Sequence, residues 1–303
     1  MNGFMTLVLV LAFSLSLLLS GCTNKPSSDA VSNISSTPAD KTLGKQGTNA
    51  SETTSKSPQS ELPLSTCSRL DAANTKYILS NDVSSNSTCF DIVSDNVTLD
   101  CRGHVLYGHQ FDGPTIYGIR IINRSGIRVG NCIISEFGTG IRMDGGRRNE
   151  LENNTLNKNQ DIEISYSDEN RISNNILKDG VISINLYSAR GTQVYGNTIS
   201  NGTGGPLQGI RLQKSADNRV YNNTILGAAN DGIYLEYSEG NILSLNRVNQ
   251  SKRYGIYFFH SSNNSLVDNV LSLHEKAIEE EFSSKNVMSN NTIILLNKTI
   301  ITR

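Results

Sequence analysis

The sequence lacks a large net charge of either sign. Its 27 lysine and arginine residues almost balance 28 aspartate and glutamate residues, and the formal net charge is −1 at pH 7. Proteins that bind the phosphate backbone carry a broad basic field, so this balance argues against nucleic acid as a partner. The chain also lacks a glycine-rich phosphate loop, a dinucleotide fingerprint and a His-Glu-x-x-His motif. The chain therefore shows none of the commonest sequence signatures of nucleotide-binding enzymes or zinc enzymes.

Long apolar runs are rare as well. The longest, Leu7 to Leu19, has about 13 residues and is too short for a comfortable membrane span. It ends in Leu19-Ser20-Gly21-Cys22, which resembles the lipobox of lipoprotein signal peptides, although residues 1–6 contain no Lys or Arg. We expect residues 1–21 to be a signal peptide and Cys22 to be lipidated. An uncleaved anchor helix and an ordinary cleaved signal are the alternatives. All three interpretations place the rest of the chain outside the cytoplasm.

The segment after Cys22 has almost no apolar residues. Residues 22–63 are rich in Ser, Thr, Lys, Pro and Asn. Such a stretch cannot bury a core, so we expect a disordered tether that holds the folded part at the outer face of the cell membrane. Later in the chain no apolar run is long enough to span a membrane, so the predicted attachment is at the N-terminus alone.

What the chain does contain is one phrase that recurs eight times, about every 22 residues. Its apolar start falls at Ile119, Ile141, Ile162, Ile184, Ile210, Ile233, Ile256 and Ile278. Eight residues later the residue is most often Asn, as at Asn149, Asn170, Asn218, Asn241, Asn264 and Asn286. Thirteen residues after each start come Cys132, Asn154, Asn175, Asn197, Asn223, Asn246, Asn269 and Asn291. A fixed period of this size indicates stacked supersecondary units.

The pattern inside each unit predicts strands. Apolar residues alternate with polar ones, as in Gly209–Gln213, and do not recur at helical spacing. Asn suits the left-handed backbone of sharp corners, and stacked Asn side chains can bond in a ladder. A leucine-rich repeat would need a Leu-x-x-Leu-x-Leu motif and a helical segment, which this chain lacks. We therefore predict an all-β, single-stranded right-handed parallel β-helix of about eight 21–26-residue turns over residues 97–303, with residues 64–96 as an N-terminal cap.

Four cysteines follow Cys22, namely Cys67, Cys89, Cys101 and Cys132. An even number in an exported protein favours disulfides, and three connectivities are possible. We favour Cys67–Cys89 and Cys101–Cys132. If Leu99 matches Val129, Cys101 lies one residue before the ladder position that Cys132 occupies, so adjacent turns bring the two within reach.

The stretch Asp95–His104 and the recurring Asn-Asn-Thr-Ile/Leu phrase carry a family resemblance. They resemble the NosD-like right-handed β-helix repeat proteins, a group related to carbohydrate-binding and sugar-hydrolase β-helix domains and common among exported archaeal surface proteins. The resemblance covers about residues 64–303. It implies the fold and an association with copper. The four histidines, His104, His109, His260 and His274, do not cluster at ligand spacing, so we expect no metal site and no cofactor.

One outward face is the candidate binding surface. Outward positions beside each repeat start combine aromatic, charged and amide side chains, at Arg120, Arg142, Asp144, Glu163, Tyr187, Arg211, Gln213, Tyr234, Glu236, Tyr257 and Phe259. A less regular row adds Tyr166, Lys214, Tyr237 and His260. Aromatic rings suit the apolar face of a sugar, and charged groups and amides suit its hydroxyls. An inert surface of cross-strand pairs is the structural alternative.

The favoured hypothesis is a surface protein that binds or scaffolds polysaccharide or another cell-envelope glycan without catalysis. The alternatives are a carbohydrate-active hydrolase, lyase or epimerase on the same face, and a structural or adhesion protein of the envelope. No convergent pair of carboxylates stands out for catalysis.

Two irregularities interrupt the repeat. The 26-residue interval contains an inserted turn, Asn201–Pro206, and Glu280 falls in a position that is otherwise apolar. Because a buried unpaired carboxylate is costly, we expect the last turn to shift register and to turn Phe282 inward.

Overall fold

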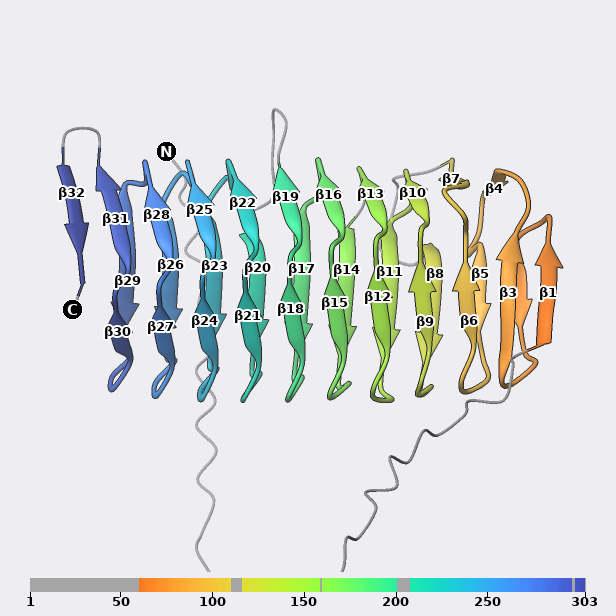
Figure 1. Ribbon diagram of the computed structural model, residues 1–303, viewed down its shortest axis with the longest axis horizontal. Coiled ribbons are helices and arrows are strands. Elements are labelled where there is room, and N and C mark those ends of the chain that lie inside the picture. The colour runs from red at the N-terminus through yellow and green to blue at the C-terminus, as the bar shows by residue number, and fades with distance from the viewer. Residues whose placement is uncertain (1–59, 110–115, 159, 201–207, 296–297, 303) are drawn as a thin grey trace, which may run out of the picture. The chain divides into compact units, whose positions relative to one another are not determined.

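The computed structural model describes residues 60–109, 116–158, 160–200, 208–295 and 298–302. The predicted signal peptide, Cys22, the tether up to residue 59 and the inserted turn at 201–206 lie outside these residues. The described regular elements are all β-strands, and they lie side by side in successive turns from β1 at one end to β31 and β32 at the other (Figure 1). Within the described ranges no helix is long and apolar enough to cross a membrane.

The strands form three sheets that run the length of the stack. Sheet A contains β1 (Ser60–Leu64), β3 (Thr75–Leu79), β6 (Thr98–Asp100), β9 (Arg128–Gly130), β12 (Glu150–Glu152), β15 (Arg171–Ser173), β18 (Gln193–Tyr195), β21 (Arg219–Tyr221), β24 (Ile242–Ser244), β27 (Ser265–Val267) and β30 (Val287–Ser289). Sheet B contains β2 (Ser68–Leu70), β5 (Phe90–Ile92), β8 (Tyr117–Ile122), β11 (Thr139–Asp144), β14 (Gln160–Ser165), β17 (Ile182–Tyr187), β20 (Gln208–Gln213), β23 (Asp231–Glu236), β26 (Tyr254–Phe259) and β29 (Lys276–Glu281). Sheet C contains β4 (Val83–Ser85), β7 (Val105–Gly108), β10 (Ile133–Ser135), β13 (Thr155–Asn157), β16 (Ile176–Lys178), β19 (Thr198–Ser200), β22 (Thr224–Leu226), β25 (Arg247–Asn249), β28 (Val270–Ser272), β31 (Thr292–Leu295) and β32 (Lys298–Ile301).

The predicted right-handed parallel β-helix is confirmed, with about ten turns where the repeat indicated about eight. The additional turns come from residues 60–108, whose strands pair in parallel with those of the repeats. Phe90 of β5, for example, pairs with Ile119, the first repeat start. Residues 60–63, expected in the tether, belong to β1. The predicted boundary between a cap and the helix at residue 97 stays a prediction.

The repeat Ile residues point into a continuous core. Ile119, Ile210 and Ile256 are fully buried, as are their partners two residues later. The Gly that often precedes the Ile is the second residue of its sheet B strand, beside the corner where the chain arrives from sheet C and the interior is crowded. A Cβ atom on Gly232 would lie 2.1 Å from Cγ1 of Val248 and 2.7 Å from the Gly255 carbonyl oxygen. The Gly-Ile pair of the repeat is therefore a packing requirement of this corner.

Asparagine forms two buried ladders along the stack, as the sequence predicts. In the first, Nδ2 of Asn197 donates to Oδ1 of Asn223 at 3.0 Å, and Nδ2 of Asn223 donates to Oδ1 of Asn246 at 3.0 Å. Each Oδ1 also accepts the backbone amide of the preceding ladder residue, as Asn223 does from Asn197 at 3.1 Å. In the Asn-Asn-Thr phrase the first residue, such as Asn222, has a positive φ and makes the corner. The second is the ladder residue.

Both favoured disulfides are present. The structure contains Cys67–Cys89 and Cys101–Cys132, and Leu99 pairs with Val129 as the predicted register requires. The amide of Cys132 donates to Oδ1 of Asn154 at 3.0 Å, so the second disulfide stands at the start of the first ladder.

The predicted register shift in the last turn is wrong. Phe258 pairs with Glu280 in the common register, and Phe282 remains 71% exposed. Glu280 is tolerated because β29 is the last strand of sheet B, where the interior is open to solvent. Its carboxylate accepts a hydrogen bond from Nδ2 of Asn286 at 2.6 Å and so avoids a buried, unpaired charge.

Candidate carbohydrate-binding face

The two regular rows of the predicted face lie on sheet B, and the less regular row, Tyr166, Lys214, Tyr237 and His260, lies at the corner directly after its strands. Parallel pairing puts one row in register from Arg120 through Arg142, Glu163 and Arg211 to Tyr234 and Tyr257. A second row runs through Asp144, Tyr187, Gln213, Glu236 and Phe259. Outward residues of adjacent turns are therefore direct neighbours, and their side chains can act together. Whether this face binds a ligand stays a prediction.

The N-terminal half of the face consists of ion pairs. Arg120 makes two bonds to Asp91, from Nε at 2.9 Å and from a terminal nitrogen at 2.7 Å. Arg142 contacts Asp144 at 3.1 Å and also bonds to Glu163. These charges satisfy one another across adjacent turns and leave little specific bonding capacity for a ligand.

The C-terminal half is aromatic. We define the aromatic patch as Tyr234, Tyr237, Tyr254, Tyr257, Phe259, His260 and Phe282. The rings of Tyr234 and Tyr257 stack with centroids 5.1 Å apart and planes 18° apart. At the adjoining corner, His260 is stacked between Tyr237 at 4.9 Å and Phe282 at 4.8 Å. The patch thus extends over several turns along the axis of the stack.

The two stacks differ in exposure. Tyr257 is 7% exposed, whereas Tyr237 is 52% and Phe282 is 71% exposed. Tyr237, His260 and Phe282 all adopt a positive φ at this corner, which directs three successive large side chains to one edge of sheet B. Asn123 adopts the same backbone conformation at the equivalent corner of an earlier turn. The aromatic residues are therefore not needed to make the corner, since Asn suffices.

Polar groups surround the buried stack. Arg211 donates to Glu236 at 2.6 Å and lies 5.8 Å from the centroid of the Tyr234 ring. The Tyr257 hydroxyl donates to Glu281 at 2.6 Å. Burial, followed by the charge of Glu236, raises the pKa of Tyr234 to about 12. Burial and the bond to Glu281 also raise the pKa of Tyr257. Both phenols therefore stay protonated near neutral pH.

Sequence reasoning missed two members of this region, Arg253 and Tyr254. The guanidinium of Arg253 lies 4.5 Å from the Tyr254 ring centroid and 5.5 Å from that of Tyr257. Tyr254 is two residues before the repeat Ile256, in a row that includes Gln208, Asp231 and Lys276. Extending the register backwards across the repeat glycine would have revealed this row.

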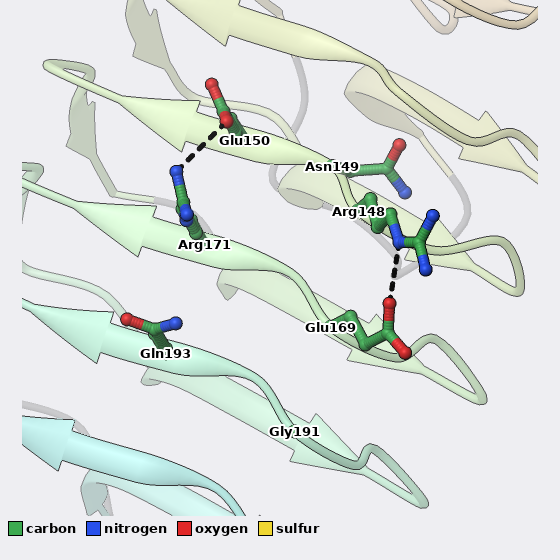
Figure 2. A pocket seen from close by; sticks show the side chains of 7 residues that line it. All are labelled: Arg148, Asn149, Glu150, Glu169, Arg171, Gly191 and Gln193. Atoms are coloured by element: carbon green, nitrogen blue, oxygen red, sulfur yellow. Dashed lines mark hydrogen bonds and ion pairs between the residues drawn. The ribbon is translucent and has the colours of Figure 1, made fainter. Parts of the chain in front are cut away.

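A separate hollow of about 420 Å³ lies on sheet A, beside β12, β15 and β18. Figure 2 shows that its charged side chains point toward one another across neighbouring turns. Nε of Arg148 is 2.7 Å from Glu169, and Arg171 is 3.5 Å from Glu150. The Arg148 and Glu169 side chains are half or more exposed, so this pair is solvated and weak. The hollow contains none of the predicted binding residues.

Two family models match the chain. One, described as periplasmic copper-binding protein (NosD), matches residues 48–230, and the other, described as right handed beta helix region, matches residues 180–293. A search of curated proteins found no match.

Solved structures resemble the chain in fold. DFA-IIIase from Arthrobacter chlorophenolicus A6, in complex with GF2, has a TM-score of 0.65 at 14% identity, over 78% of this chain and 77% of that one. The Dettilon tailspike protein has a TM-score of 0.57 at 15% identity, over 78% of this chain and 55% of that one. Identities this low establish the fold alone.

The side chains do not fit the copper that one family description names. Among the described residues, no group of three or more His, Cys, Asp and Glu side chains could hold a metal ion. His104 lies 3.1 Å from Asp82, and His260 is stacked between two rings. His274 contacts the Val248 carbonyl oxygen and the Ser251 amide, each at 3.1 Å. The four described cysteines form disulfides and so provide no thiolate ligand.

Proposed function

Because the chain belongs to the family described as periplasmic copper-binding protein (NosD), whose model matches more than half of it, we propose a function outside the cytoplasm. We infer that the protein is a surface β-helix that binds or scaffolds polysaccharide on the outer face of sheet B and does not cleave it. A lipid on Cys22 would hold it at the outer face of the cell membrane.

The aromatic patch carries this proposal. Exposed planar rings recur at successive turns and stand beside carboxylate, guanidinium and phenol groups. Rings cover the apolar C–H faces of sugars, and the polar groups bond to the hydroxyls. A polymer that runs along the stack would meet similar groups at each turn. The exposed corner of Tyr237, His260 and Phe282 would provide the principal contact.

Export is supported by the disulfides. Cys67–Cys89 and Cys101–Cys132 require an oxidising compartment to form and persist. This agrees with the periplasmic location in the family description. Attachment through Cys22 rests on the lipobox-like sequence that precedes it.

Binding without cleavage is supported by the ion pairs that the carboxylates of this face already make. Glycoside hydrolysis uses two carboxyl groups about 5–9.5 Å apart, with one free to donate a proton. On this face Glu236 bonds to Arg211, and Arg142 contacts both Asp144 and Glu163. These three carboxylates are therefore engaged in ion pairs within the protein and are not directed at a ligand.

A polysaccharide array probed with the full chain tests the proposal. We expect binding that falls about tenfold in Tyr237→Asn and in Phe282→Asn, which corresponds to about 1.4 kcal/mol. Asn suits the left-handed corner, as Asn123 demonstrates, so the fold should be retained. Leu245→Asn is the matched control, because Leu245 also has a positive φ and is 56% exposed but lies at the corner between β24 of sheet A and β25 of sheet C.

The outcomes separate the candidate functions. Unchanged affinity in both patch variants would clear this face of the role. New reducing ends or unsaturated products in the bound polysaccharide would favour the enzyme. Absence of binding to any glycan would leave the structural or adhesion role.

A further inference from the structure

We propose that the polysaccharide recognised by the aromatic patch is neutral and rich in hydroxyl groups, and is not a polyuronate or a sulfated polymer. This inference rests on the proposed function and names its ligand class. It follows from the distribution of charge on the outer face of sheet B.

The cations of this face already have carboxylate partners. Arg120 is 2.7 Å from Asp91, Arg142 contacts Asp144 and Glu163, Arg211 is 2.6 Å from Glu236, and Lys276 bonds to Glu279. The three arginines bond to carboxylates on neighbouring turns, so these bonds are built into the stack, whereas Lys276 and Glu279 lie on one strand. A carboxylate on a ligand would have to displace a protein carboxylate from its guanidinium, with no net gain in ion pairs.

Two further cations lie against aromatic rings. Nζ of Lys214 is 5.6 Å from the Tyr187 ring centroid and 3.5 Å from the Tyr187 hydroxyl. Arg253 covers the rings of Tyr254 and Tyr257. These positions do not form the row of evenly spaced, exposed cations that a polyanion would need at successive sugars.

Carboxylates predominate around the patch. Strands β23, β26 and β29 contain five acidic residues and one lysine. One of the five, Asp231, is buried, and burial raises its pKa. Of the remaining four, Glu236, Glu279 and Glu281 occupy outward positions, and Glu281 directly precedes the exposed ring of Phe282. Glu280 occupies the interior position opposite Phe258. An anionic polymer would therefore be repelled at the most exposed ring of the patch.

The same groups suit a neutral polymer. The side chain of Glu281 is exposed on the outer face and, beside its bond from the Tyr257 hydroxyl, can accept hydrogen bonds from sugar hydroxyls. The exposed rings of Tyr237 and Phe282 provide apolar contact that requires no charge.

Affinity electrophoresis of the full chain tests this inference. The gels would contain neutral glucans or mannans in one set, and polygalacturonate or alginate in the other, each at about 20 mM and about 500 mM salt. We expect retardation by a neutral polymer at both salt concentrations. At low salt, where repulsion extends furthest, the polyuronates should bind at least tenfold more weakly.

Each outcome has a distinct meaning. Polyuronate binding that equals or exceeds neutral binding at low salt and weakens at high salt would overturn the inference and leave the proposed function standing. Failure of both sets to retard the folded chain would overturn the proposed function itself. Retardation by neutral polymers that is lost in Tyr237→Asn and kept in Leu245→Asn would support both.

Discussion

The backbone amide of Asn291 donates to the hydroxyl of Thr302 at 3.1 Å, and this bond ends the first asparagine ladder. Nδ2 of Asn291 also reaches the same hydroxyl, at 3.3 Å. Thr302 follows β32, which pairs antiparallel with β31 and so covers the last edge of sheet C. A threonine thus accepts the bonds that the next asparagine of the ladder would have accepted.

Removing that acceptor should loosen the last turn. Thr302→Ala leaves the Asn291 amide without its partner at a partly exposed site, so we expect a loss of about 1 kcal/mol in the free energy of unfolding. The amide of Asn291 should exchange hydrogen faster with solvent. Thr302→Ser keeps the hydroxyl and is the control. Equal exchange rates in all three proteins would contradict the capping role.

Substitution of a ladder asparagine in the middle of the stack should lower the free energy of unfolding more than substitution of Thr302. Asn223→Ala removes the acceptor of the Asn197 amide and side chain, and the donor to the Val194 carbonyl oxygen. Because these groups are buried, we expect a loss of about 3 kcal/mol or more in urea unfolding. Asn222→Gly is the matched control, since Asn222 makes the adjacent exposed corner with a positive φ. If the two variants were equally stable, the ladder would contribute nothing beyond the corner.

His274 should make stability depend on pH. Burial lowers the pKa of His274, whereas an unfolded histidine titrates near about 6.5. The unfolded chain therefore binds the proton more readily, and stability should fall as the pH decreases below about 6.5 toward the folded-state pKa. His274→Ser introduces the residue found at position 251, one turn earlier, and should flatten this dependence. Unfolding in urea at several pH values measures it, and an unchanged slope would assign the effect to other groups.

The two disulfides should differ in their resistance to reduction. Cys101 and Cys132 are fully buried, whereas Cys67 is partly exposed. Thiol–disulfide exchange requires access, so mild reductant should open Cys67–Cys89 first. Differential alkylation followed by mass spectrometry would measure the order. Loss of Cys101–Cys132 should cost about 2–4 kcal/mol in stability, and its prior reduction would contradict the burial seen here.

Repetition explains why so much of the fold could be predicted. Ile233 and Asn223 occupy positions that recur in nearly every turn. Once one such position is known, the repeat length gives the equivalent residue in each of the other turns. The register placed Leu99 opposite Val129 and so brought Cys101 near Cys132, as the structure confirms. The first turns escaped notice because their residues depart from the repeat. Phe90, for example, fills a position that Ile occupies later.

Positions that depart from the repeat were predicted less well. Glu280 was interpreted by its interior register alone, but it lies in the last strand of sheet B, where that position is exposed. Arg253 and Tyr254 were missed because their row lies beyond the repeat glycine, toward sheet C. Glu280 is exposed because no further turn follows it, and the row of Tyr254 is not marked by the repeated phrase.

The sequence by itself determined the solenoid, the inward and outward rows and the closeness of Cys101 to Cys132, because each depends on a period that can be counted along the chain. The tertiary structure alone decided which outward charges are satisfied. Arg211 bonds to Glu236, two residues beyond its partner in the register, and Tyr237 and Phe282 enclose His260 across three turns. These contacts depend on the direction of each side chain between turns, which the order of residues does not specify. They separate an ion-paired half of sheet B from an aromatic half whose corner rings are exposed.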